Sequence, residues 1–174
     1  PYMGPIYGQF ILTSNGVKII EVNARVGDPE AMNVLPLLQT DFIDVCSAML
    51  DKTLSKKDVK LEKKSTVCKY VVPEGYGIKS MTGEIIDVNE DAIRHIGALL
   101  FYASVNKKNN HIITGSSRSL AVVGINDELA EAEKTCEQAL TYIKGDHLFI
   151  RHDIGTKKLL EKRIHHMESI RGRK

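Results

Sequence analysis

The fold is decided by residues 19–30, which read Ile19-Ile20-Glu21-Val22-Asn23-Ala24-Arg25-Val26-Gly27-Asp28-Pro29-Glu30. This apolar run carries a carboxylate and an amide two residues apart. Side chains of a strand point to alternate faces, so Glu21 and Asn23 share one face while Ile20 and Val22 fill the other. Polar groups in a strand this apolar are costly to bury unless something binds them. The stretch therefore predicts a strand with one ligand-binding face.

The preceding residues predict a partner strand. Residues 6–13 read as a second strand, and Ser14-Asn15-Gly16 reads as a turn in front of Val17. A three-residue loop would place Thr13 opposite Val17 and Gln9 opposite Glu21, where cross-strand neighbours sit roughly 5 Å apart. Gln9, Glu21 and Asn23 would then offer three oxygen donors with one negative charge, which suits Mg²⁺. Spacing alone leaves another interpretation open, a polar patch that caps a neighbouring loop.

Composition excludes some partners. The net charge of +2 gives no argument for nucleic acid, and no apolar run reaches membrane-spanning length, so neither partner is expected. Cys46, Cys68 and Cys136 lie in apolar contexts without ligand-like spacing, which predicts core thiols in a reducing cytosol and a cytoplasmic location. Pro1 opens the chain in the middle of a pattern, which suggests a fragment or a processed product.

The first part of the chain then turns helical. Residues 30–38 predict a short helix, and Asp41 is the expected N-cap of a helix over 42–50. Its apolar positions recur with helical spacing, at Phe42, Val45, Cys46 and Met49. Residues 51–64 are rich in lysine and predict a solvated linker with a domain boundary; a phosphate-binding patch is the alternative.

The second part predicts several short strands and few helices, a small β-rich unit in an α+β chain. Asn109-Asn110 predicts a turn, and the tail over 156–174 predicts a basic helix with an apolar stripe at Leu160, Ile164 and Met167. Asp127 is expected to cap one helix. The expected strands cover residues 66–72, 84–88, 99–105, 112–114, 119–125 and 148–150, and the inner face of that helix comprises Leu129, Ala132, Cys136, Ala139 and Ile143.

Two sets of motifs resemble one enzyme family. Residues 7–10, 17–30 and 33–38 resemble the end of the ATP-grasp domain of phosphoribosylamine–glycine ligases, also called glycinamide ribonucleotide synthetases. Residues 69–76, 115–123 and 151–155 resemble the C-terminal domain of the same family, although Ser116 and Ser117 replace its usual glycines and Tyr102-Ala103-Ser104 replaces its more typical H-A-G-T. The resemblance implies that residues 1–52 are the end of the ATP-grasp domain and that 65–155 form a barrel-sandwich-like C-terminal domain. The charge-rich residues 53–64 between them are expected to be a linker, and residues 156–174, which extend beyond where the family usually ends, a basic helical tail.

The resemblance also implies roles for individual residues. Glu21 and Asn23 would hold the Mg²⁺ or Mn²⁺ that bridges the ATP phosphates, with Gln9 as a further ligand. Arg25 would be catalytic, beside the reacting phosphoryl group, where a planar and permanently charged guanidinium suits oxyanions. Asp28 and Glu30 would either orient the loop or meet the substrate amine. For Arg118 and Arg151, a structural ion pair is expected rather than substrate contact, with Asp153 as one candidate partner.

The implied reaction is a step of purine biosynthesis. ATP phosphorylates the carboxylate of glycine, and the amine of 5-phosphoribosylamine attacks the glycyl phosphate, which gives glycinamide ribonucleotide, ADP and phosphate. The sequence carries no Gly-rich phosphate loop, so we expect a missing N-terminal part as partner and no activity without it. Two alternatives stay open: another ATP-grasp carboxylate–amine ligase, or a non-catalytic binding module that uses the β-rich half and the basic tail.

Overall fold

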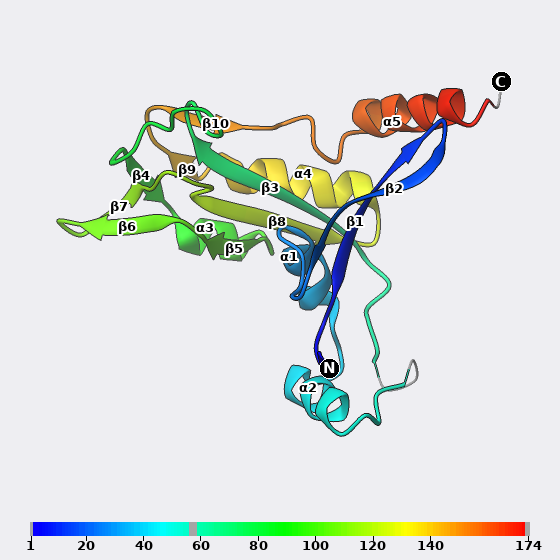
Figure 1. Cartoon of the computed structure of the whole chain (residues 1–174). Coiled ribbons are helices and arrows are strands. Elements are labelled where there is room, and N and C mark those ends of the chain that lie inside the picture. The colour runs from blue at the N-terminus through cyan, green and yellow to red at the C-terminus, as the bar shows by residue number, and fades with distance from the viewer. Residues whose placement is uncertain (1, 56–58, 173–174) are drawn as a thin grey trace. The chain divides into compact units, whose positions relative to one another are not determined.

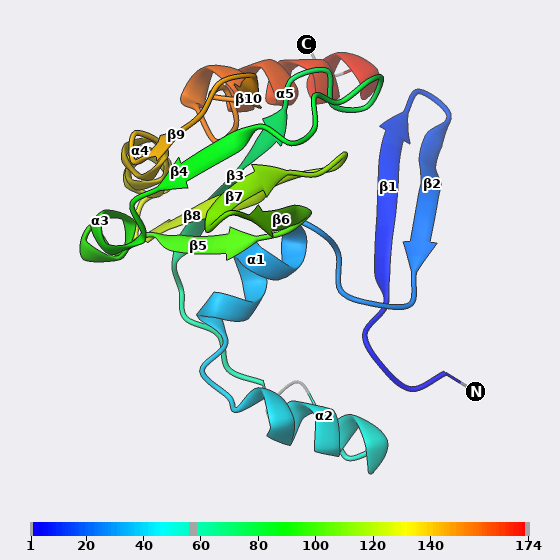
Figure 2. The same ribbon diagram turned by 90° about the vertical axis from the view of Figure 1, so that its left-hand side faces the viewer.

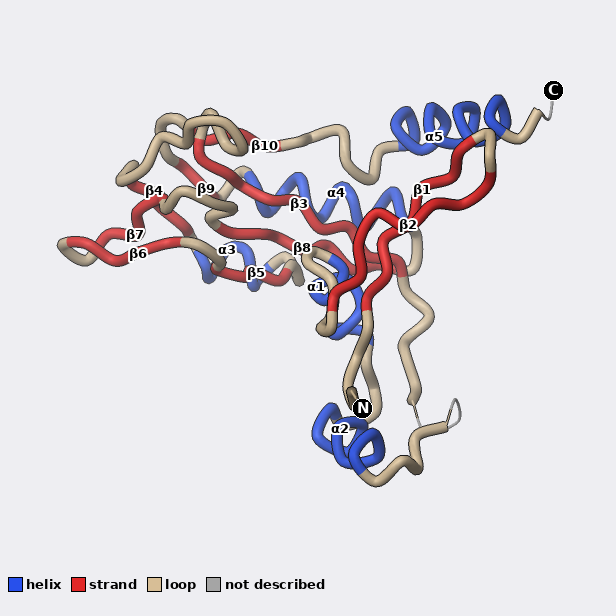
Figure 3. Tube along the Cα trace, viewed as in Figure 1, coloured by secondary structure: helices blue, strands red, loops and turns tan. Residues whose placement is uncertain are grey.

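The computed structural model describes residues 2–55 and 59–172, so positions 56–58 of the predicted linker lie outside the described residues. The chain divides into two compact units, one of residues 1–63 with 158–174 and one of residues 64–157. The α+β prediction is confirmed, since antiparallel sheets dominate and the helices are few (Figure 3). The assignment of residues 1–52 to the end of an ATP-grasp domain stays a prediction.

The first unit begins with a β-hairpin. Strands β1 (Tyr7–Thr13) and β2 (Gly16–Asn23) pair antiparallel and form a two-stranded ribbon (Figure 2). Gln9 lies opposite Glu21, as predicted, but Thr13 lies opposite Gly16, so the predicted pairing of Thr13 with Val17 is wrong. The turn is tighter than predicted because the Thr13 hydroxyl accepts from the Asn15 amide and donates to the Gly16 carbonyl. Only Ser14 and Asn15 therefore connect the strands.

A β-bulge restores the register that brings the polar side chains together. Phe10 pairs with Ile19 while Gln9 pairs with Glu21, so Ile20 is the extra residue of β2. Directly paired residues share a face, and the bulge therefore separates the ribbon into a polar and an apolar face. The polar face carries Tyr7, Gln9, Glu21 and Asn23, and the apolar face carries Phe10, Leu12, Val17, Ile19 and Val22.

The apolar face of the hairpin carries large exposed side chains. Val17 and Ile19 are 63% and 65% exposed, and Phe10 and Val22 are also more than half exposed. A two-stranded ribbon buries too little surface to be stable alone in water, and a contiguous exposed apolar face is typical of an interaction surface. This face is therefore a candidate interaction surface.

The rest of this unit is helical. Helix α1 (Glu30–Val34) leads into the 3-10 helix η1 (Leu35–Leu37), and α2 (Phe42–Leu50) begins after Asp41, whose carboxylate accepts from the Ile43 amide at 2.7 Å. The predicted N-cap is confirmed. The end of the predicted linker is not simply solvated, because Leu61 forms a β-bridge with Leu38. Helix α5 (Lys157–Ile170) lies in the predicted tail.

The second unit contains two four-stranded antiparallel sheets (Figures 1 and 2). The first has the order β10-β3-β8-β5 and the second the order β6-β7-β4-β9. The strands are β3 (Ser65–Pro73), β4 (Ile85–Val88), β5 (Leu99–Tyr102), β6 (Val105–Lys108), β7 (His111–Thr114), β8 (Leu120–Asn126), β9 (Ile143–Lys144) and β10 (Leu148–Ile150), with helices α3 (Glu90–His95) and α4 (Leu129–Leu140).

The core forms where α4 packs along β3 and β8 (Figure 1). Val71, Val122, Ala132 and Cys136 are completely buried there. Gly124 of β8 allows the close approach of the helix, because a Cβ at that position would overlap the backbone of α4 at Ala132 and Cys136. Small residues on both elements therefore set the spacing between helix and sheet.

Three local predictions for this unit are wrong. The strand predicted over 99–105 is two strands, since the chain breaks at Ala103 and Ser104 and enters the other sheet at Val105. Asp127 does not cap α4, whose N-cap is Glu128 without a side-chain hydrogen bond. Ile143 belongs to β9 and not to the helix, and α3 was not predicted at all.

The three cysteines are free thiols that differ in exposure. Cys46 is half-buried, whereas Cys68 and Cys136 are buried, so the core-thiol prediction fails for Cys46 alone. Burial raises the pKa of Cys136 to about 12, which leaves about one thiolate in 10⁴ at pH 8.

In the native protein we expect iodoacetamide to modify Cys46 first and to leave Cys136 intact, as measured by peptide mass spectrometry. In urea all three should react; rapid native labelling of Cys136 would contradict this.

Candidate metal and phosphate site

The candidate site occupies the polar face of the hairpin. The pairing of Gln9 with Glu21 and of Tyr7 with Asn23 brings the three predicted donors onto one face. Asn23 Nδ2 donates to Glu21 Oε1 at 2.9 Å, so the two side chains lie in contact. Glu21 and Gln9 are exposed and Asn23 is half-buried, which leaves their oxygens accessible to a ligand.

The oxygen donors of Gln9, Glu21 and Asn23 suit a hard cation that also binds water or substrate phosphates. Within residues 2–55 and 59–172, no three His, Cys, Asp or Glu side chains come together as a metal cage. The site offers instead one carboxylate and two amides, and the Asn23 contact leaves Glu21 Oε2 and Asn23 Oδ1 as acceptors. Mg²⁺ is commonly bound by one or two carboxylates together with water and substrate phosphates. The residues present are therefore compatible with Mg²⁺ or Mn²⁺ carried on a nucleotide.

The loop after β2 holds the other predicted residues. Arg25 is exposed, and its Nη1 donates to the Val26 carbonyl at 2.9 Å. Asp28 is exposed as well, and Glu30 is half-buried at the start of α1. The loop turns back on itself, since the Ala31 amide donates to the Gly27 carbonyl at 2.9 Å. The first turn of α1 is thereby fixed to the loop that carries Arg25.

Sequence reasoning missed Tyr7 as a member of this site. The Tyr7 hydroxyl donates to Glu30 Oε1 at 2.8 Å, which ties the loop to the polar face of the hairpin. This hydrogen bond, partial burial and the negative charges of Glu30 and Glu21 raise the pKa of Tyr7. Gly27 is buried beside this pair. The signal in the sequence was the position of Tyr7, two residues before Gln9 and so on the same face.

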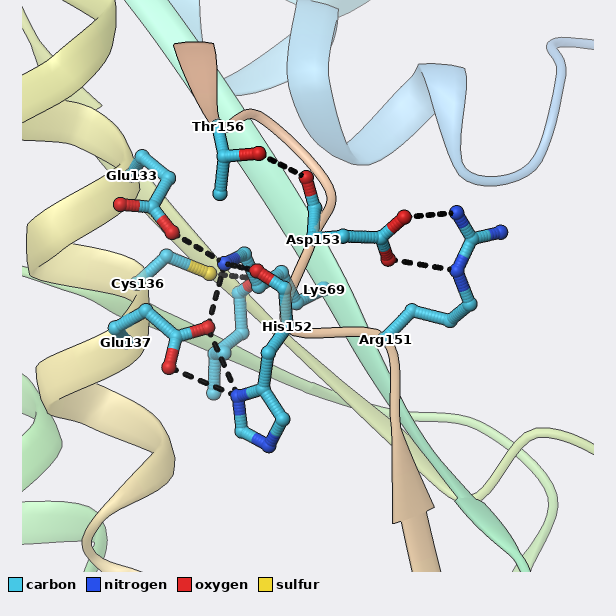
Figure 4. Close-up of polar contacts among 9 residues, drawn as sticks. Lys69, Glu133, Cys136, Glu137, Arg151, His152, Asp153 and Thr156 are labelled. Carbon is cyan, nitrogen blue, oxygen red and sulfur yellow. Dashed lines mark hydrogen bonds and ion pairs between the residues drawn. The ribbon is translucent and has the colours of Figure 1, made fainter. Parts of the chain in front are cut away.

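A second polar cluster, which sequence reasoning also missed, lies in the unit of residues 64–157 (Figure 4). Lys69 of β3 is completely buried, and its ammonium donates to Glu133 at 2.6 Å, to Glu137 at 2.5 Å and to the His152 carbonyl at 2.8 Å. Burial would lower the pKa of Lys69, but the two carboxylates outweigh burial and raise it. All three N–H donors of the ammonium are used, so this cluster is structural.

Hydrogen bonds of this cluster link the segment after β10 to helix α4. His152 Nδ1 lies 2.9 Å from Glu137 Oε2, and Arg151 forms a two-point ion pair with Asp153 at 2.8 and 2.7 Å (Figure 4). The expected Arg151–Asp153 ion pair is confirmed. Arg118 lies 5.0 Å from the centre of the Tyr70 ring, which is a cation–π contact.

The Glu137 contacts predict a pH dependence of stability. Burial raises the pKa of Glu137, but hydrogen bonds from Lys69 and His152 outweigh burial and hold the pKa below its ordinary 4.5. Because the pKa of Glu137 is lower in the folded protein than in the unfolded chain, its ionised carboxylate stabilises the fold at pH values above the unfolded pKa. This stabilisation is lost as the pH falls through the folded pKa. We expect Glu137→Gln to destabilise the protein at pH 7 and the deficit to shrink below pH 4.5, measured by urea unfolding. As a control at pH 7, Glu131→Gln removes a carboxylate from an exposed ion pair with Lys134 and should cost little stability.

Among the described residues, none of the helices has both the length and the apolar character needed to cross a bilayer.

Comparison with known proteins places these features in context. Residues 66–157 match the family described as phosphoribosylglycinamide synthetase, C domain. The chain is 52% identical over 170 residues to a phosphoribosylamine–glycine ligase of Methanocaldococcus jannaschii and 51% identical to that of Methanococcus vannielii. Each alignment covers 98% of this chain and 38% of the relative, so the chain spans about two-fifths of their length.

A solved structure shares the fold. The crystal structure of a phosphoribosylamine–glycine ligase from Thermotoga maritima superposes with a TM-score of 0.69 over 85% of this chain and 36% of that protein. The two sequences are 21% identical over this region. The arrangement of antiparallel strands and helices is therefore similar despite considerable sequence divergence.

Proposed function

The chain belongs to the phosphoribosylamine–glycine ligase family, and from this premise we propose that it supplies the C-terminal part of a ligase that joins glycine to 5-phosphoribosylamine. ATP transfers its γ-phosphoryl group to the glycine carboxylate and leaves as ADP. The amine of 5-phosphoribosylamine then attacks the carbonyl carbon of glycyl phosphate, an N–C bond forms, and phosphate leaves with the former carboxylate oxygen. The product is glycinamide ribonucleotide, an intermediate of purine biosynthesis.

The observation that carries this proposal is the shared face of Glu21, Asn23 and Gln9, with Glu21 and Asn23 in contact at 2.9 Å. These residues would hold Mg²⁺ or Mn²⁺, which neutralises and orients the ATP phosphates when bound. Glu21 supplies the one negative charge of the set, and Asn23 fixes its carboxylate through the amide hydrogen bond. Glu21 and Asn23 therefore act together as the nucleotide-binding pair.

Arg25 is proposed as the catalytic cation. It is exposed on the loop directly after β2, two residues beyond Asn23. A guanidinium there would stabilise the negative charge that develops on the transferred phosphoryl group. Asp28 follows on the same loop and Glu30 begins α1, and both are proposed to face the substrate amine.

The apolar face of the hairpin supports a partner within the ligase. Phe10, Val17, Ile19 and Val22 are each more than half exposed. We propose that the N-terminal part of the ligase covers this face and supplies the adenine and phosphate contacts. The 174-residue chain alone is then expected to be inactive.

A chimera tests this function. The N-terminal part of the Methanocaldococcus jannaschii relative would be fused upstream of this chain, and ADP release would be measured with ATP, Mg²⁺, glycine and 5-phosphoribosylamine. We expect ADP release that requires both substrates, and none from either part alone. ADP release with other amino acids but not with glycine would favour another carboxylate–amine ligase, and its absence with every amino acid would contradict the proposal.

A further inference from the structure

We propose that Tyr7 is a positioning residue for the amino-acid substrate: its hydroxyl holds the Glu30 carboxylate beside the Glu21–Asn23 pair, where Glu30 accepts the ammonium group of glycine. This inference rests on the proposed function and deepens it. Tyr7 acts through Glu30 and has no contact with the reacting atoms.

The chemistry of the substrate requires an anion near the metal. Glycine is a short zwitterion whose nitrogen lies about 2.5 Å from its carboxylate carbon. Its carboxylate must reach the γ-phosphate, which the cation on Glu21 and Asn23 would hold. The ammonium therefore comes close to the same face, where a desolvated cation without an acceptor would be costly.

Glu30 is a carboxylate that the structure holds at this face through a hydrogen bond. Tyr7 lies opposite Asn23 in the hairpin, and its hydroxyl donates to Glu30 Oε1 at 2.8 Å. Tyr7 uses one acceptor position of Glu30, so the carboxylate keeps others for an ammonium group.

The packing around this contact restricts where Glu30 can lie. A Cβ on Gly27 would overlap the Glu30 carboxylate and would approach the Tyr7 ring to 3.0 Å. Gly27 is buried, and its carbonyl accepts from the Ala31 amide. The glycine thus lets the loop close against Tyr7, and the hydroxyl then selects one orientation of Glu30.

Steady-state kinetics of the chimera test the inference. Tyr7→Phe removes only the hydroxyl, and we expect KM for glycine to rise about tenfold, as for loss of one hydrogen bond to a charged group. Both kcat and KM for ATP should stay within about twofold, because the variant leaves the metal ligands in place. Glu30→Gln should raise KM for glycine about 100-fold. The double variant should match Glu30→Gln alone, since Tyr7 acts only through Glu30.

A matched control removes another tyrosine hydroxyl of the same unit. Tyr2 donates to the Ala24 carbonyl at 2.9 Å, so Tyr2→Phe also deletes a tertiary hydrogen bond and should leave KM for glycine unchanged. Three results with an active chimera would overturn this inference alone. Tyr7→Phe could keep the original KM for glycine, it could lose kcat at saturating glycine, or its effect could be additive with that of Glu30→Gln. An unmodified chimera without glycine-dependent ADP release overturns the proposed function and this inference together.

Discussion

Glu21→Gln is expected to lower glycine-dependent ADP release by the chimera about 10³-fold. The substitution keeps the shape of the side chain but removes the single negative charge from the proposed metal donors. The Asn23 amide would then face a neutral partner in place of the carboxylate that it contacts at 2.9 Å. Because phosphoryl transfer depends on the cation for charge neutralisation, the loss should fall mainly on kcat.

Binding of Mn²⁺ provides a readout that does not depend on turnover. Electron paramagnetic resonance of the chimera with Mn²⁺ and ATP should show weaker binding in Glu21→Gln than in the unmodified protein. Glu168→Gln removes the same charge from an exposed position on α5 and should change neither quantity. Equal activity and equal Mn²⁺ affinity in Glu21→Gln would refute the metal site on this face.

Lys69→Met should cost about 3 kcal/mol of the unfolding free energy. Methionine fills a similar volume, so the effect isolates the lost ammonium rather than a cavity. Glu133 and Glu137 would keep their charges beside a completely buried position, and the His152 carbonyl would lose its donor. The loss should appear as faster hydrogen exchange at the amides of β3 and β8, which belong to the buried sheet.

Two further variants separate the buried charge from general surface effects. Lys134 forms an exposed ion pair with Glu131 at 3.5 Å, and Lys134→Met should cost less than about 0.5 kcal/mol. Adding Glu133→Gln to Lys69→Met should recover part of the lost stability, because it removes one carboxylate that has lost its partner. A Lys69→Met protein as stable as the original would contradict the structural role of the cluster.

Local periodicity was sufficient for most elements. The apolar run of β3, the Asn109-Asn110 turn and the Asp41 N-cap follow from neighbours in the sequence, and the structure contains all three. Both residues of that turn have positive φ, as two-residue hairpin turns of this kind require. Two of the errors occur where the chain changes sheets, at Val105, and where a bulge offsets a tighter turn, at Ile20. Neither a change of sheet nor a bulge alters the alternation of polar and apolar residues from which strands are predicted.

The sequence by itself determined the α+β class and the family resemblance, because these depend on patterns and motifs along the chain. The predicted pairing of Gln9 with Glu21 is correct only because the bulge at Ile20 offsets the one-residue error at Thr13. Only the tertiary structure revealed that Tyr7 holds Glu30 at 2.8 Å and that Lys69 contacts Glu133, Glu137 and the His152 carbonyl. Those partners lie 23 to 83 positions apart in the chain. Such contacts arise when packing brings distant segments together, and the cost of burying a charge then decides which side chains must meet.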